Sequence, residues 1–259
     1  MEKKNPFSSF DWYFTDASEE DAARFRALKD RPQQTSVLMN VVSADSLTHF
    51  ALWSQLPPGH PVAELWLETQ TDLVATIYLA YGGFFRQALT VLRAWFEIAV
   101  HGVYFSGHYG QPDGRYEQWR RGQRNAPAKM QAIAKSLASR TDKALQVGES
   151  AILEKLYPVY KVLSLQTHAQ GLDIYELQEG RDNVPRYLPK SFDLWYAKVL
   201  EAFNAISFLY RVFFPEEIAT YLKGSKAELE SAVELKNLIG KLIPEFGELV
   251  EDVLVLVIR

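Results

Sequence analysis

Two long helical stretches joined by a glycine pair constrain the fold more than any other feature of this sequence. Apolar residues recur with a helical period over 62–81 and again over 84–105, and Gly82-Gly83 lies between the two segments. At 1.5 Å per residue, each helix would be roughly 30 Å long. Two helices of similar length with so short a joint predict an antiparallel helical hairpin over about 62–105.

Helical periodicity also dominates the rest of the chain, and no internal repeat is visible. The sequence therefore predicts an all-α helical bundle that forms a single domain over 1–259, with an irregular N-terminal segment over 1–17. We expect helices near 148–168 and 191–213 to cover the hairpin. Shorter helices are expected over 18–31, 35–56, 116–123, 127–144, from Pro215 onward, and over 225–243.

Local signals indicate where some of these helices begin and break. Ser43 is expected to cap the start of a short helix within 35–56, and the segment PPGHP (57–61) to follow its end. Pro158 lacks an amide hydrogen, so the helix that follows Gly148 is expected to bend or restart there. The tail FGELVEDVLVLVIR is open, because its alternating valines allow a strand and its apolar spacing allows a helix.

Composition bounds the functional class. The chain has 28 Lys and Arg, 32 Asp and Glu, and no cysteine. The lack of cysteine excludes disulfides, thiolate zinc sites and cysteine nucleophiles, and a net charge of −4 provides no global basic field for nucleic acid. The longest apolar run, between Asp72 and Arg86, is shorter than a membrane span, and the N-terminus lacks the apolar core of a signal peptide. We therefore expect a soluble, cytoplasmic protein.

Polar side chains interrupt the second helix of the predicted hairpin. At 100° per residue, four of them fall within a sector of roughly 80°: Arg86, Arg93, Glu97 and His101. One interpretation is the solvated strip of an amphipathic helix, in which Arg93 and Glu97 form an i,i+4 pair. The other is an ion-pair network or a pocket lining, because charges in a covered seam must be paired.

An acidic stripe on the first helix supports the second interpretation. Glu64, Glu68 and Asp72 are spaced by four and share a face. We therefore expect Arg93 to point inward and to pair with Asp72 or Glu97. A turn at Gly82-Gly83 would bring these pairs to the same level: Asp72 with Arg93, Glu68 with Glu97, and Glu64 with His101.

Metal, nucleotide and hydrolase motifs are missing from the sequence. Glu97 and His101 are four residues apart and have no second copy, unlike the Glu-x-x-His pairs of di-iron bundles. No Walker loop, GxGxxG, GxSxG or HExxH is present. We predict no metal site and no cofactor.

An arginine-rich segment is a candidate binding surface. RYEQWRRGQR (115–124) interleaves arginines, among them Arg120 and Arg121, with Tyr116 and Trp119. Such patches bind phosphates and stack bases, although a solvated helix can have the same pattern. RNA is therefore a candidate partner.

His168 is a second candidate for chemistry. It lies near a predicted helix C-terminus, where the helix dipole favours the charged imidazole. Either it is a capping or surface residue, or it acts as an acid, a base or a ligand.

Two segments resemble landmarks of a family. YGGFFRQALTVLRAWFE (81–97) resembles a signature of prokaryotic all-helical proteins, R-x-A-x-x-x-L-R-x-x-x-E after a glycine. Those proteins are similar to the HEPN superfamily, helical domains of toxin–antitoxin and abortive-infection systems that are often ribonucleases. LYPVYKVLSLQTHAQG (156–171) resembles a second landmark, a leucine-serine pair before a histidine. The resemblance implies these positions of interest: Arg86, Arg93, Glu97, Ser164 and His168.

The sequence departs from the ribonuclease motif of that superfamily. HEPN ribonucleases share an R-x4–6-H motif, in which arginine holds phosphate and histidine handles the ribose 2′-hydroxyl. Here seven residues separate Arg93 from His101, and Lys161 stands where an arginine would precede His168.

Two functions are therefore expected. The first is a helical module, homodimeric and non-enzymatic, that binds a protein partner or nucleic acid in a prokaryotic defence or stress-response system. Its apolar tail VLVLVI is a candidate docking surface. The second is a metal-independent ribonuclease, with His168 or His101 as general acid/base and Arg93 or Arg86 stabilising phosphate charge.

Overall fold

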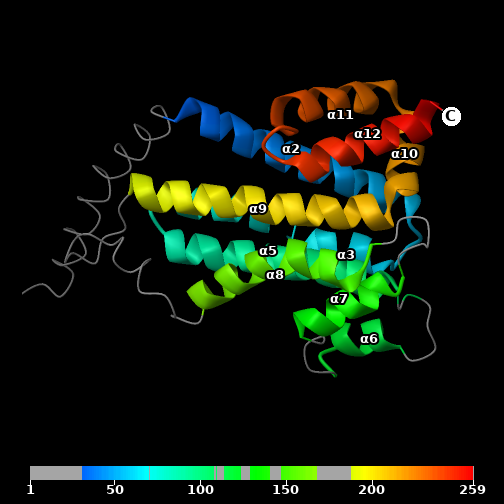
Figure 1. Ribbon diagram of the computed structural model, residues 1–259, viewed down its shortest axis with the longest axis horizontal. Helices are drawn as coiled ribbons and strands as arrows, with labels where there is room; N and C mark the ends of the chain where they lie inside the picture. The colour runs from blue at the N-terminus through cyan, green and yellow to red at the C-terminus, as the bar shows by residue number, and fades with distance from the viewer. Residues whose placement is uncertain are drawn as a thin grey trace, which may run out of the picture.

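The computed structural model describes residues 31–69, 71–107, 109, 114–123, 129–140, 147–167 and 188–258. Within these ranges the regular elements are all helices, which confirms the predicted all-α bundle (Figure 1). The expected irregular segment 1–17 and nearly all of the expected helix 18–31 lie outside them. The helices are α2 (Pro32–Gln55), α3 (Pro61–Thr69), α4 (Asp72–Tyr81), α5 (Phe85–Ser106), α6 (Arg115–Arg120), α7 (Met130–Ala138), α8 (Glu149–Thr167), α9 (Pro189–Phe213), α10 (Pro215–Gly224), α11 (Lys226–Ile239) and α12 (Pro244–Ile258).

Helix α9 lies between two groups of helices (Figure 1). It packs against α12 on one side and against α5 and α8 on the other, while α2 packs against α10 and α11. Large aromatic side chains fill the centre: Trp95 of α5 stacks near Phe203 of α9, with ring centroids 6.4 Å apart. Over the residues placed here, no helix combines the length and apolarity needed to cross a membrane.

Helices α3 and α4 both pack along α5. The Thr76 hydroxyl donates to the Ala88 carbonyl at 2.7 Å, and it accepts the Trp195 indole N–H at 2.9 Å. At the other end of α5, a Cβ added to Gly102 would lie only 3.2 Å from the Val62 Cα atom. The turn between α4 and α5 uses Gly83 at φ +76°, a conformation that favours glycine.

The single helix predicted over 62–81 is wrong, because the structure divides it into α3 and α4. The Thr69 hydroxyl donates back to the Trp66 carbonyl at 3.1 Å. Leu65, Thr69 and Leu73 are all buried, so a helical spacing continues across the division, which is why periodicity predicts one helix.

Two other local expectations are corrected. Ser43 does not cap a helix: α2 begins at Pro32, and the Ser43 hydroxyl donates to the Met39 carbonyl at 3.0 Å. Of the two alternatives at Pro158, a bend or a restart, the restart is wrong, because α8 continues through this residue. Pro158 and Glu154, the residue four positions earlier, are both exposed, so water can satisfy the carbonyl that the missing N–H would have bonded.

The C-terminal tail is helical, so the strand alternative is wrong. Leu249, Val250 and Val253 are buried at helical spacing, whereas Val255 is 51% exposed. Alternating valines therefore fall on different sides of α12 instead of sharing one face. The helices expected over 116–123 and 127–144 are also shorter, as α6 and α7.

Candidate functional site

Arg93 and Glu97 form the centre of the polar strip on α5. The Arg93 Nε atom lies 2.8 Å from the Glu97 Oε1 atom, and the two side chains are 16% and 27% exposed. The Arg93 Cζ atom also lies 5.9 Å from the ring centroid of Tyr160, on α8. Arg93 therefore pairs with Glu97, which is one of the two partners expected for it. Helix α8 covers part of the polar strip.

His101 lies on the same strip but in an aromatic environment. Its ring centroid is 6.0 Å from that of Trp119 on α6 and 6.3 Å from that of Phe105. Desolvation by these neighbours lowers the pKa of His101 to about 4. The imidazole is therefore neutral near pH 7, where it lacks the proton that a general acid would donate.

The acidic stripe does not face the strip in the expected way. Glu64 accepts a hydrogen bond from the Tyr116 hydroxyl at 2.8 Å and pairs with Arg120 at 3.1 Å, instead of meeting His101. Asp72 is half-buried at the start of α4, and desolvation raises its pKa. The side chain of Glu68 lies outside the described part of the chain.

The arginine-rich segment is largely paired with carboxylates. Arg120 bonds Glu64 and also Glu117, at 3.0 Å, and Arg121 lies 3.7 Å from Glu117. Tyr116 is only 4% exposed, so its ring is covered and cannot stack on a base in this conformation. The sequence pattern did not reveal that these charges would be neutralised within the fold.

The remaining candidates are only partly brought together. Arg86 is exposed on α5, two turns before Arg93, and Ser164 is half-buried on α8, one turn after Tyr160. Helices α5 and α8 pack against each other. His168 lies outside the described residues.

Sequence reasoning missed a buried polar cluster between α2, α3 and α9. His49 Nε2 lies 3.1 Å from the Tyr210 hydroxyl and 3.3 Å from Asp45 Oδ1, and the His49 ring stacks on Trp66 at 5.2 Å. Burial and the Asp45 charge raise the pKa of Tyr210. Because Asp45, His49 and Tyr210 are at most 5% exposed, the cluster is enclosed and offers no surface to a substrate.

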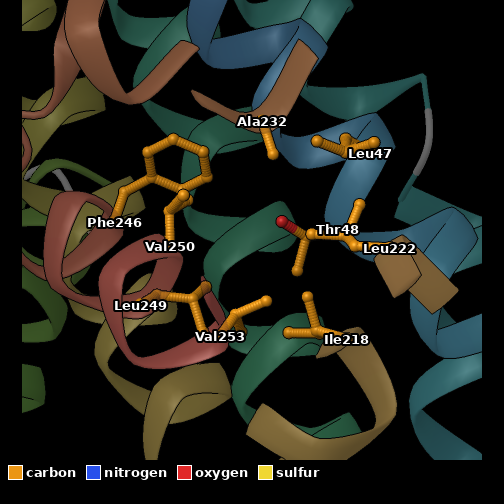
Figure 2. Close-up of a pocket in the computed structure, with 9 residues that line it drawn as sticks. All are labelled: Leu47, Thr48, Ile218, Leu222, Ala232, Phe246, Leu249, Val250 and Val253. Atoms are coloured by element: carbon orange, nitrogen blue, oxygen red, sulfur yellow. The ribbon is translucent and has the colours of Figure 1, made fainter. Parts of the chain in front are cut away.

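A small pocket between α2, α10, α11 and α12 is apolar (Figure 2). Thr48 supplies the only polar side chain in its lining, and its hydroxyl already donates to the Ala44 carbonyl at 2.8 Å. No titratable group lines it, so the pocket has no means for acid–base chemistry. Its lining residues are Leu47, Thr48, Ile218, Leu222, Ala232, Phe246, Leu249, Val250 and Val253.

The solvent side of α2 is the second feature that the sequence analysis missed. Met39, Phe50 and Trp53 are 55%, 46% and 55% exposed. The side has no charged residue, because the one carboxylate of α2, Asp45, is buried. The helical spacing of Met39, Phe50 and Trp53 in the sequence could have indicated this exposed side of α2. We call this side the α2 outer face, consisting of Ser36, Met39, Ser43, Ser46, Phe50 and Trp53.

Metal binding has no support among the residues described: no group of three or more His, Asp or Glu side chains there could hold an ion.

The chain matches no protein-family model, no curated protein and no solved structure.

Proposed function

We propose that this chain is a non-enzymatic helical module that binds a protein partner through the α2 outer face. The observation behind the proposal is the exposure of Met39, Phe50 and Trp53 on a face without charge. A solvated helix face normally carries charged residues. The centres of protein interfaces are instead depleted of charge and enriched in aromatic residues and methionine.

The opposite side of α2 gives this face a rigid base. Leu38, Val41 and Leu52 are fully buried, so the backbone that presents the exposed side chains is fixed by the core. A surface held in place before binding loses little conformational entropy when the partner arrives.

Charge favours a protein partner over nucleic acid. A nucleic-acid interface needs cations that can neutralise phosphates. Helix α2 has no Lys or Arg, while Arg93 and Arg120 are each paired with a carboxylate. On the resemblance to HEPN-like proteins, we extend the proposal to a cytoplasmic role in prokaryotic defence or stress response.

Single cysteines can test whether the face is occupied, because the chain has none of its own. Ser43→Cys lies on the α2 outer face and Thr220→Cys lies at an exposed position of α10. Both variants are treated with a small maleimide in the host cell at native expression level, and again after purification and strong dilution. We expect the thiol of Ser43→Cys to be protected in the cell and reactive when dilute, with that of Thr220→Cys reactive in both. Equal labelling of the two variants in the cell would contradict the proposal.

The ribonuclease alternative has its own test. Labelled total RNA is incubated in EDTA with the wild-type protein, His168→Ala and His101→Ala. We expect no cleavage by any of the three. Cleavage by the wild type that is lost in His168→Ala would replace the binding module with an enzyme.

A further inference from the structure

The α2 outer face has the spacing of a helix-pairing seam. Its six residues follow one another at intervals of three and four, from Ser36 to Trp53. On an α-helix this spacing keeps them within a sector of roughly 100° and over a length of about 25 Å. Alternation of three and four is the pattern by which one helix packs along another.

Side-chain size along the seam is graded. Ser43 and Ser46 lie at the middle of α2, Ser36 and Met39 lie toward its start, and the bulky Phe50 and Trp53 lie toward its end. The small central residues allow close approach of a second helix. If an identical helix crosses antiparallel at this centre, Phe50 meets Met39 and Trp53 meets Ser36. Large side chains then face smaller ones, and the antiparallel helix dipoles attract.

Charge separates this face from the exposed apolar side of α12. A two-fold contact brings a surface against its own copy, so any charge near the axis meets the same charge. The α2 outer face has none, whereas the exposed side of α12, around Val255, also presents Glu251 and Asp252. The face of α2 can therefore meet its own copy without like-charge repulsion, whereas that of α12 cannot.

We infer that the partner seated on the α2 outer face is a second copy of this chain, with the two α2 helices packed antiparallel about a two-fold axis near Ser43 and Ser46. The inference rests on the proposed function, because it names the occupant of the same face. The result is a symmetric dimer whose interface buries the exposed Trp53 and Met39 side chains of both copies.

Sedimentation equilibrium of the purified full chain tests the dimer. The wild type is expected at twice the chain mass, and Trp53→Glu or Met39→Glu should weaken association by at least about 30-fold, the effect of losing an interface hot spot. Leu238→Glu is the matched control, because Leu238 is 53% exposed on α11, compared with 55% for Trp53 and Met39. It should leave association unchanged. Circular dichroism checks that each variant is folded; Phe50 is left intact because its ring packs on Trp66.

Cross-linking tests the antiparallel arrangement. With the axis between Ser43 and Ser46, the two copies of position 43 are offset by about 5 Å along the helices, whereas the two copies of position 36 are about 25 Å apart. At a concentration where the dimer forms, mild oxidation should therefore join the two copies of Ser43→Cys through a disulfide and leave Ser36→Cys unlinked. Cross-linking of both variants would indicate parallel helices and overturn the inference.

The outcomes separate this inference from the proposed function. A monomer at all concentrations, with the thiol of Ser43→Cys protected in the cell, would keep the binding module and assign the face to a different protein. Protection of that thiol in the dilute, purified monomer would mean that another part of the same chain covers the face, which overturns both.

Discussion

Replacing Thr76 with valine tests the hydrogen bonds that join three helices at the centre of the bundle. Thr76 is fully buried, donates to the Ala88 carbonyl at 2.7 Å, and accepts the Trp195 N–H at 2.9 Å. Valine keeps the β-branched shape, so side-chain volume and rotamer preference change little. The main consequence is that the Trp195 N–H, on a fully buried ring, loses its acceptor.

An unsatisfied buried donor costs about 1–3 kcal/mol. The Ala88 carbonyl lies inside α5 and remains an acceptor for its own helix. Loss of its bond from Thr76 therefore adds less to the cost than loss of the Trp195 acceptor. We therefore expect Thr76→Val to lower the free energy of unfolding by about 1–3 kcal/mol, as a shift of the urea midpoint with an unchanged m-value.

Thr90→Val is the matched control. It makes the same chemical change on α5, where the exposed Thr90 hydroxyl only donates back to the Arg86 carbonyl at 2.9 Å. We expect a change within about 0.5 kcal/mol there. If Thr76→Val cost no more than Thr90→Val, Trp195 would have another acceptor and the reasoning would be refuted.

Three further predictions concern α5 and its neighbours. Arg93→Ala removes the ion pair with the half-buried Glu97 and should lower the free energy of unfolding by about 1–3 kcal/mol in urea. Gly107→Ala should lower the melting temperature, because a Cβ there would lie 2.5 Å from the Arg140 Nε atom and displace a guanidinium that donates to the Val103 carbonyl and the Ser106 hydroxyl, bonds worth about 1–3 kcal/mol. The pKa of His101, about 4, should be visible by NMR titration, and stability should fall as the pH drops from about 6.5 toward 4, since the unfolded chain binds more protons there.

Each of these has a control. Lys226→Ala removes a solvent-exposed i,i+4 pair with Glu230 and should cost less than about 0.5 kcal/mol. If Arg93→Ala cost equally little, the polar strip of α5 would be merely the solvated side of that helix. Gly148→Ala, which meets nothing within 4 Å, should not lower the melting temperature. His101→Gln should make the acid slope of stability shallower without abolishing it, because burial also lowers the pKa of His60 to about 4. An unchanged slope would count against a lowered pKa of His101.

The fold followed from the sequence where apolar periodicity was long and continuous. The helices corresponding to α5 and α9 were predicted near their observed bounds, because many residues contribute to one periodic pattern. The division between α3 and α4 was missed, because the buried residues Leu65, Thr69 and Leu73 keep a helical spacing across it. At Ser43, a residue typical of a cap was given more weight than the apolar pattern on both sides of it.

Site residues were predictable only where the partner lay one helical turn away. Arg93 and Glu97 belong to one helix, so their spacing was sufficient. The partner of Glu64, Arg120, comes from α6, 56 residues later, and Tyr210 reaches His49 across 161 residues. Such pairings depend on how helices cross, which spacing within a helix does not determine.

The hydroxyl of Thr76 also links contacts that differ widely in loop length. Its bond to Ala88 closes 12 residues, whereas its bond to Trp195 closes 119. Because shorter loops lose less entropy on closing, we expect α4 and α5 to associate early and α9 to dock later. The Trp195 indole, fully buried in the native state, would then report that second event. Because the chain has six tryptophans, its signal is the difference between the fluorescence of the wild type and of Trp195→Phe, and this difference should lag behind the helical circular dichroism signal in stopped-flow refolding.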